Sequence, residues 1–266
     1  MQDAGLRQID VGGCGLADYM KAMLSDDELD RYARHIVLRE IGGTGQTRLK
    51  AARVALVGMG GIGAPAALYL AAAGIGTLGL IDDDVVSLSN LQRQVLYATA
   101  EIGMAKTTAA ARHLKAINPH TDYIEHKIRL NTDNTTEILG QYDLLLDGCD
   151  NFPTRTLVNQ ACHDLKKPLV SAAIGRWSGQ LSVFDGSPCY QCLVPEIPPD
   201  AETCERVGVI GALAGVMGSL AALEAIKLIT GAGEPLLGKV LILDGLTMQS
   251  RIVTLPPDPT CPVCAS

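Results

Sequence analysis

Short apolar runs alternate with small-residue and amphipathic segments along most of the chain. Residues 54–57 and 77–81 are apolar runs of strand length, and the alanine-rich residues 64–73 between them predict a helix that begins near Ile62. A further strand is predicted over residues 142–147. Strands that alternate with helices are typical of an α/β protein with a parallel sheet. We therefore expect a doubly wound, mostly parallel, Rossmann-like fold.

The last third of the chain predicts an antiparallel extension of this sheet. Strands are expected over residues 179–184 and 239–244, with a long helix over residues 209–229 between them. The most apolar part of that helix, residues 209–223, is shorter than a bilayer span and runs into the charged Glu224. We therefore expect a buried helix, or a helix at a dimer interface, and no membrane span.

The first residues of the chain carry no clear pattern. They lack the basic and then apolar segments of a signal peptide, which favours a cytoplasmic protein. We expect residues 1–24 to form a disordered tail and residues 25–266 to form a single domain. At 266 residues the chain is long enough to bury a substantial core in one α/β domain.

The charge balance narrows the classes of partner. The chain holds 22 basic and 29 acidic residues and has a formal net charge of −7. This balance argues against nucleic acid or a membrane surface as the main partner. Only 4% of the residues are aromatic, whereas glycine is abundant. Helices packed closely on a sheet would explain that composition.

A glycine-rich turn follows the first apolar run. Gly58, Gly60 and Gly63 fit the pattern G-x-G-x-x-G. In such a turn the first glycine makes a tight bend, the second lets backbone N–H groups approach a phosphate, and the third lets the helix pack closely on the strand. Asp82 ends the next strand, 19 residues after Gly63, where a carboxylate binds ribose hydroxyls. The segment predicts a nucleotide-binding site without identifying the nucleotide.

A second group of polar residues follows the later strands. Asn90, Arg93 and Lys106 occupy positions expected to be loops or helix starts, and Asp150 follows the strand over residues 142–147. At the carboxyl ends of parallel strands these side chains would meet one phosphate chain, with Mg²⁺ held by Asp150. Hydride transfer has no use for such a set, whereas displacement at phosphorus does. Taken singly, each residue is equally explained as an ordinary solvated loop charge.

Four of the eight cysteines form two C-x-x-C pairs, Cys189 with Cys192 and Cys261 with Cys264. Two such pairs predict a tetrahedral Cys₄ zinc site, which would be structural because four thiolates leave no open position. The 68 residues between the inner cysteines mean that the metal would tie the C-terminus back to mid-chain. A redox dithiol or disulfides are the alternatives, and a cytosolic setting disfavours disulfides.

Four further cysteines lie outside these pairs, and one of them, Cys14, falls in the N-terminal tail. Cys149 and Cys162 fall on or beside core elements and are expected to be packing residues. Cys204 lies in the loop of residues 195–207, and Arg206 two residues away can lower a thiol pKa. Cys204 is therefore either a nucleophile or sulfur carrier, or an incidental surface cysteine.

The order of these motifs resembles that of the MoeB/ThiF/HesA family, the bacterial relatives of ubiquitin-activating enzymes. The resemblance covers residues 25–264 and rests on the two cysteine pairs and the following segments: Arg31 to Arg39, the glycine turn, Asp82-Asp-Asp, Ser89-Asn-Leu-Gln-Arg-Gln94, Lys106, and Asp147-Gly-Cys-Asp-Asn151. It implies that the chain uses ATP and Mg²⁺ to adenylate the C-terminal Gly-Gly carboxylate of a small ubiquitin-fold sulfur-carrier protein, with release of pyrophosphate.

The resemblance also implies how the nucleotide is bound. Asp82 would bind the ribose. The nucleotide cradle would be formed by Gly58, Gly60, Gly61 and Gly63. The phosphates would be contacted by Asn90, Arg93 and Lys106, with Gln94 nearby.

Three residues would have roles beyond binding. Asp150 would coordinate Mg²⁺, and its loss would be the most harmful. Arg34 would act as an arginine finger, which in this family reaches the ATP of the other subunit of a homodimer. Cys204 matches the position of the family's acceptor cysteine, which some members use for a covalent intermediate and others do without.

Within the family, different segments favour different members. Residues 64–73 look ThiF-like, whereas residues 171–180 and the loop around Cys204 look closer to the MoeB type. We favour adenylation of a MoaD-type carrier in molybdenum cofactor biosynthesis, with ThiF-type adenylation of ThiS in thiamine biosynthesis as the alternative. No rhodanese-like sequence follows Cys264, so we expect a separate protein to donate sulfur. We expect the carrier to bind an apolar face of the antiparallel extension, beside the helix over residues 209–229.

Two functions of other classes compete with this one. A nicotinamide-dependent oxidoreductase would use the glycine turn and Asp82 but would leave Arg93, Lys106, Asp150 and the cysteine pairs without a role. A non-catalytic, zinc-stabilised scaffold would bind the carrier without turning over ATP. Binding of NADH but not ATP would identify the first, and carrier binding without turnover would identify the second.

Overall fold

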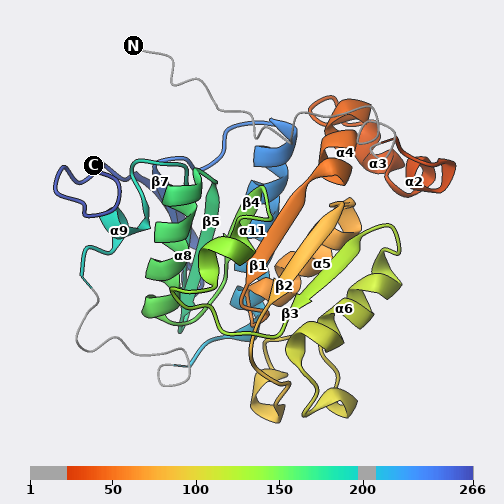
Figure 1. The fold of residues 1–266 in the computed structure, drawn as a ribbon, viewed down its shortest axis with the longest axis horizontal. Helices are drawn as coiled ribbons and strands as arrows, with labels where there is room; N and C mark the ends of the chain where they lie inside the picture. Colours follow the sequence, from red (N-terminus) through yellow and green to blue (C-terminus); the bar gives the residue numbers. More distant parts are fainter. Residues whose placement is uncertain (1–22, 197–207, 266) are drawn as a thin grey trace.

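A computed structural model of the chain contains one eight-stranded sheet with the strand order β3-β2-β1-β4-β5-β6-β7-β8 (Figure 1). The structure describes residues 23–196 and 208–265. Most of the predicted N-terminal tail and Cys204 lie outside the described residues.

The first five strands are parallel and the last three are antiparallel, as the sequence predicts. The parallel strands are β1 (Arg53–Val57), β2 (Thr77–Ile81), β3 (Asp122–His126), β4 (Leu144–Asp147) and β5 (Leu169–Gly175). The antiparallel strands are β6 (Ser178–Phe184), β7 (Lys239–Asp244) and β8 (Gln249–Thr254). The expected α/β class with an antiparallel C-terminal extension is confirmed.

Helices cover both faces of the sheet (Figure 1). On one face lie α5 (Gly63–Ala73), α6 (Lys106–Ile117) and α11 (Gly211–Thr230). On the other lie α7 (Thr135–Leu139) and α8 (Phe152–Leu165). The remaining helical segments are α2 (Asp26–Arg31), α3 (Ala33–Ile36), α4 (Gly42–Ala51), α9 (Tyr190–Leu193) and the short 3₁₀ turns η1 (Leu88–Asn90) and η2 (Thr99–Glu101).

Alternation along the strands divides the core into two layers. In β1, Val54 and Leu56 pack in the cluster formed with α5 and α11, whereas Ala55 and Val57 pack in the cluster formed with α7 and α8. Successive side chains of a strand point to opposite faces, and here both faces are covered. This is why the strand is apolar throughout instead of alternating with polar residues.

Small residues let α5 and α11 approach each other and the sheet closely. A Cβ atom at Gly63 would lie 1.9 Å from the backbone oxygen of Gly58, and one at Gly218 would lie 2.5 Å from the backbone oxygen of Ile62. Neither position tolerates a side chain without movement of the backbone. The close approach explains the richness of the chain in glycine and alanine and its scarcity of aromatic residues.

Strand β4 is shorter than predicted, because it begins at Leu144 instead of residue 142. Tyr142 is fully buried, and its backbone N–H donates to the carbonyl of Leu139 at 3.2 Å. Its hydroxyl lies 2.7 Å from Nε2 of His126. The turn that follows α7 therefore uses the backbone of Tyr142 before the ladder with β1 begins.

We expected the apolar segment of this helix to be too short to cross a membrane, and for α11 that expectation is wrong. The helix has 20 residues with a mean hydropathy of 1.7, which is long and apolar enough by length and composition alone. Half of its apolar window is buried inside the protein, where it packs on α5 and β5. Buried Glu224 accepts a hydrogen bond from the N–H of Leu236 at 2.9 Å. These contacts are those of a core helix.

Candidate active site

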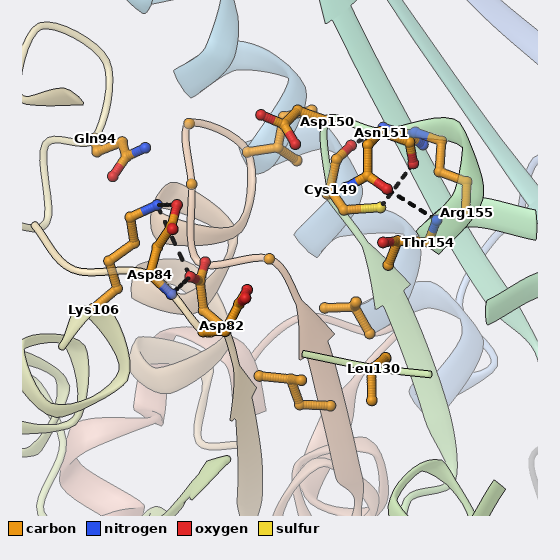
Figure 2. Close-up of a pocket in the computed structure, with 18 of the residues that line it drawn as sticks. Asp82, Asp84, Gln94, Lys106, Leu130, Cys149, Asp150, Asn151, Thr154 and Arg155 are labelled. Carbon is orange, nitrogen blue, oxygen red and sulfur yellow. Dashed lines mark hydrogen bonds and ion pairs between the residues drawn. The ribbon is translucent and has the colours of Figure 1, made fainter. Parts of the chain in front are cut away.

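A cavity of about 350 Å³ opens at the carboxyl ends of β1, β2 and β4 (Figure 2). The chain leaves β1 toward β2 and β3 on one side, whereas β4 and β5 lie on the other side of β1. The connections therefore diverge between β1 and β4, which is where ligands bind in open α/β sheets. The cavity is lined by nine of the residues that the sequence singles out: Gly58, Gly60, Gly61, Asp82, Asn90, Arg93, Gln94, Lys106 and Asp150.

The glycine turn forms one wall of the cavity. Gly58 has a φ of +87°, which disfavours any residue with a side chain, and a Cβ atom there would lie 3.1 Å from the backbone of Cys149. Gly60 and Gly61 line the cavity directly, at the start of α5. Gly63 does not line it and instead lets α5 pack on the turn. The N-terminus of α5 lies next to this turn, and a helix N-terminus suits an anion.

Asp82 holds the glycine turn from the end of β2. Its carboxylate accepts a hydrogen bond from the N–H of Met59 at 2.7 Å and another from the N–H of Asp84 at 2.9 Å. Burial raises the pKa of the Asp82 carboxyl, and the nearby ammonium of Lys106 opposes that rise. Asp82 therefore links the turn after β1 to the segment after β2.

Lys106 extends into the cavity from the first turn of α6. Its Nζ lies 2.9 Å from Oδ2 of Asp84 and 3.9 Å from Oδ1 of Asp82 (Figure 2). The backbone fixes this arrangement, because the N–H of Lys106 donates to the carbonyl of Asp84 at 3.0 Å. A buried ammonium between two carboxylates is a preformed cation at the site. A bound phosphate would compete with Asp84 for it.

The segment after η1 supplies the other polar side chains of this wall. Nη1 of Arg93 donates to the carbonyl of Ser89 at 3.0 Å, and Arg93 also lines the cavity. Gln94 is buried, and its Oε1 has no hydrogen-bond partner among the described residues. A buried amide that is short of a partner is costly unless a ligand or water completes it.

The loop after β4 presents Asp150 on a rigid base. Asp147, at the end of β4, is buried and accepts hydrogen bonds from the N–H and the thiol of Cys149 at 3.0 and 2.7 Å. Arg155 of α8 pairs with Asp147 at 2.9 Å and donates to the carbonyl of Ala172 at 2.8 Å. Asp150 itself is exposed and lines the cavity. Figure 2 draws no hydrogen bond or ion pair from its carboxylate to the other residues shown, so the carboxylate is available to a ligand.

Cys149 acts as a structural thiol in this loop. Burial raises the pKa of the Cys149 thiol well above its usual range, and the Asp147 carboxylate raises it further. The thiol therefore stays protonated and donates to Asp147. Cys162 is also buried, in the layer formed with α7 and α8. Both cysteines pack as the sequence predicts.

The four paired cysteines meet in space although the pairs are far apart in the sequence. The four Sγ atoms all lie within 4.8 Å of one another, with Cys189 and Cys261 3.6 Å apart and Cys192 and Cys264 3.4 Å apart. A tetrahedral ion with Zn–S bonds of about 2.3 Å would hold sulfurs about 3.8 Å apart. Disulfide bonds of about 2.05 Å are excluded by these distances. The donor set and its geometry fit a thiolate metal site.

Comparison with known proteins now defines the family. The model of the ThiF family matches residues 32–263. This chain belongs to the ThiF family. It is 46% identical over 247 residues to a sulfur carrier protein adenylyltransferase of Thermus thermophilus, covering 90% of this chain and 91% of that protein.

Two further proteins are similar to this chain. It is 45% identical over 247 residues to the adenylyltransferase and sulfurtransferase MOCS3 of Anopheles gambiae; the match covers 91% of this chain and 56% of that longer protein. Among solved structures, E. coli MccB with ATP superposes with a TM-score of 0.78 at 25% identity, covering 89% of this chain and 75% of that chain.

One residue expected at the site lies far from the cavity within the chain. Arg34 is an exposed residue of α3. Helices α2, α3 and α4 lie together at one end of the strands, and the start of α6 lies at the other end (Figure 1). Nη1 of the nearby Arg31 donates to the carbonyl of Ile117 at the end of α6, whereas Lys106 at the start of α6 lines the cavity. Arg34 therefore does not contribute to the cavity of its own chain.

Sequence reasoning missed several residues that build the site. Arg155 and Asp84 position the predicted residues, and Ile81, Ile128 and Leu130 form an apolar wall of the cavity. The start of α8 carried a readable signal, since an Asn followed by Phe-Pro-Thr is a helix N-terminus. There Oδ1 of Asn151 accepts from the N–H of Thr154 at 3.0 Å. The partners of Arg155 lie at the end of β4 and in β5, and they have no local signal.

Proposed function

We propose that this chain is an adenylyltransferase that joins AMP from ATP to the C-terminal glycine of a small ubiquitin-fold sulfur-carrier protein. One observation carries the proposal: a glycine turn, the cations Lys106 and Arg93, and the free carboxylate of Asp150 share one cavity at the switch point of the sheet. Hydride transfer needs the glycine turn alone, whereas displacement at phosphorus needs all of them. Membership of the ThiF family and the activity named for the Thermus thermophilus relative support the same conclusion.

The cavity has two ends of different character, which suits ATP. The apolar side chains of Ile81, Ile128 and Leu130 form one end, where adenine would bind. Asp82 lies next to the glycine turn, where the ribose would meet its carboxylate. The phosphates would then lie between the turn and the polar residues Asn90, Arg93, Gln94 and Lys106.

The reaction follows from this placement. An oxygen of the carrier's terminal carboxylate attacks the α-phosphorus, a new oxygen–phosphorus bond forms, and the bond from the α-phosphorus to the bridging oxygen breaks. The electron pair of the broken bond leaves with pyrophosphate. No general base is required, because a terminal carboxyl with a pKa of about 3.5 is already ionised at neutral pH. Catalysis then consists of alignment and charge stabilisation.

Asp150 would hold the Mg²⁺ ion that accompanies ATP. When bound, the ion offsets negative charge on the phosphate oxygens and on the departing pyrophosphate. Carboxylate oxygens are the protein ligands that Mg²⁺ prefers. Asp150 suits this role because its carboxylate is exposed to the cavity while the loop around it is held by the Asp147–Arg155 pair.

The carrier would dock on the antiparallel extension of the sheet. The tips of the β5–β6 and β7–β8 hairpins lie at the same edge as the cavity, joined by a 2.7 Å hydrogen bond from the N–H of Gly245 to the carbonyl of Trp177. Trp177, Leu246 and Met248 are exposed apolar side chains at these tips. An apolar surface beside the cavity would place the carrier's tail at the α-phosphate. We propose a MoaD-type carrier, and so a role in molybdenum cofactor biosynthesis.

Four further proposals complete this function. A homodimer would bring Arg34 of one subunit to the ATP of the other, because α3, which carries Arg34, lies at the end of the strands opposite the cavity of its own chain (Figure 1). Cys204 would be the acceptor cysteine, and a separate protein would donate sulfur. We place the activity in the cytoplasm, since no disulfide joins the cysteines of the described segments, as is typical of a reducing compartment.

We further propose that the four-cysteine cluster holds a structural Zn²⁺ ion. A ligand present at 1,000 times its Kd stabilises the folded state by about 4 kcal/mol, so a zinc chelator is expected to lower Tm by about 10 °C. Calorimetry with and without chelator measures this change. The double variant Cys261→Ser/Cys264→Ser is the control, and its Tm should not respond. The zinc proposal would be contradicted if the purified protein contained no metal and its Tm were the same with and without the chelator.

The adenylation proposal is tested by ATP–pyrophosphate exchange with Mg²⁺. Purified MoaD-type and ThiS-type carriers are supplied in separate reactions, and each carrier lacking its terminal Gly-Gly serves as a control. We expect exchange with the MoaD-type carrier only. Exchange with ThiS alone would move the protein to thiamine biosynthesis. If the folded protein binds a carrier but shows no exchange with either carrier, the result would favour a non-catalytic, zinc-stabilised scaffold.

A further inference from the structure

Helix α8 presents three polar residues, each one turn after the last, on one face. Asn151 caps the helix at the cavity, Arg155 joins the helix to Asp147, and Asn159 is the third. Residues four apart in a helix lie on the same side. The third position reaches the cysteine cluster, which the adenylation reaction does not use.

Asn159 is buried, with 2% of its surface exposed, and both ends of its amide are engaged. Its Oδ1 accepts a hydrogen bond from the backbone N–H of Tyr190 at 2.8 Å, and its Nδ2 donates to Sγ of Cys189 at 3.6 Å. A backbone N–H only donates, so the amide oxygen must face Tyr190 and the NH₂ group must face the sulfur. The direction of the N–H···S bond is thereby fixed.

Contacts on two sides of Asn159 fix its position. One turn earlier, Arg155 binds Asp147 and the carbonyl of Ala172, which holds α8 against the sheet. On the other side, the bond to Tyr190 holds the residue that follows Cys189. The amide is therefore preorganised for the sulfur before any ion binds.

A donor in this position has a direct electrostatic effect on a metal site. Four thiolates around one divalent cation carry an excess of two negative charges. An N–H group directed at one sulfur disperses part of that charge and holds the sulfur in its ligand orientation. A carboxylate in the same place would do the opposite.

We propose that Asn159 is a positioning residue of the metal site: its amide holds the Cys189 sulfur in the orientation of a metal ligand. This inference rests on the proposal that the four-cysteine cluster binds Zn²⁺. It is independent of which carrier is adenylated. A residue that only packs α8 against the segment at Tyr190 would leave the affinity for metal unchanged.

Two substitutions separate positioning from packing. Asn159→Asp keeps the size of the side chain and an acceptor for Tyr190, but it turns a carboxylate oxygen toward Cys189. Asn159→Leu removes both hydrogen bonds. Gln160→Leu is the matched control, since Gln160 is the next residue of α8, is exposed, and bonds only with Asp164 among the described residues.

The test uses the purified full-length chain, stripped of metal under reducing conditions. Zn²⁺ affinity is measured by competition with a chromophoric chelator, and Co²⁺ is added separately to record the thiolate-to-cobalt absorption bands. Loss of an outer partner of a metal ligand commonly weakens metal affinity by about 10- to 100-fold. We expect that loss for Asn159→Asp, with shifted cobalt bands, and a twofold change at most for Gln160→Leu.

The outcomes distinguish this inference from the proposals on which it depends. If the unchanged protein binds neither Zn²⁺ nor Co²⁺, the metal site and this inference both fail, whereas adenylation stands on its own assay. If the unchanged protein binds both ions and Asn159→Asp binds them equally well with the same cobalt bands, Asn159 only packs. Should Asn159→Leu fail to fold, the comparison of Asn159→Asp with Gln160→Leu decides the result.

Discussion

Replacing Asp150 with alanine is expected to lower the rate of ATP–pyrophosphate exchange by at least about 10²- to 10³-fold, the usual effect of losing one electrostatic contact to a transition state. The two carboxylates next to Lys106 are already engaged. Asp82 already accepts two backbone hydrogen bonds, and Asp84 is paired with Lys106. Asp150 is exposed and has no partner within the described residues, so the fold should not depend on it.

Two matched variants make the Asp150 result specific. Asp150→Asn keeps the shape of the side chain but removes its charge, and it should be impaired nearly as severely as the alanine variant. Asp122→Ala removes an exposed aspartate at the start of β3, at the opposite edge of the sheet, and should exchange at the normal rate. The measurement is exchange at saturating ATP, with thermal unfolding as a check. Near-normal exchange by Asp150→Ala would remove Asp150 from the reaction.

Replacing Arg155 with alanine is expected to reduce the free energy of unfolding by about 3 to 5 kcal/mol, because it strands a buried carboxylate. Asp147 is 1% exposed and would keep only its bonds to Cys149 and Ser171. The carbonyl of Ala172 would also lose its donor. Since these groups form the base of the Asp150 loop, the variant should also bind ATP more weakly.

Urea denaturation measures the expected loss for Arg155→Ala. Lys127→Ala is the control, because it breaks an exposed pair with Glu125 at 3.0 Å and should cost about 1 kcal/mol or less. Adding Asp147→Asn to Arg155→Ala should recover part of the loss, since the stranded charge is then removed. If Arg155→Ala is no more destabilising than Lys127→Ala, the buried pair does not hold this loop.

Local sequence rules were sufficient for the framework of the fold. The glycine turn, the apolar strands on either side of α5 and the acidic residue after β2 lie within about thirty consecutive residues, and each obeys a short-range rule. The antiparallel strands β6 and β7 were predicted for the same reason. Strand direction then places nine predicted residues around one cavity.

Features that depend on distant partners were beyond these rules. Arg155 bonds to β4 and β5, and Asn159 bonds to a cysteine thirty residues away. The bounds of α11 agree with the helix predicted over residues 209–229, but the length of its apolar stretch was underestimated, because Glu224 lies inside the protein with its carboxylate satisfied by the backbone of Leu236. The pairing of Lys106 with Asp84 likewise needs the two segments to lie side by side.

The sequence by itself determined the α/β class, the nucleotide-binding turn, the residues available to a phosphate and the two cysteine pairs. Each of these features depends on residues that lie close together in the chain at fixed spacing. Only the tertiary structure decided that the cysteine pairs meet, that Arg34 lies away from its own cavity, and that Arg155 and Asn159 support the two sites from one helix. Burial and hydrogen bonding act between whichever residues the fold brings together, so contacts between distant residues cannot be predicted from their spacing along the chain.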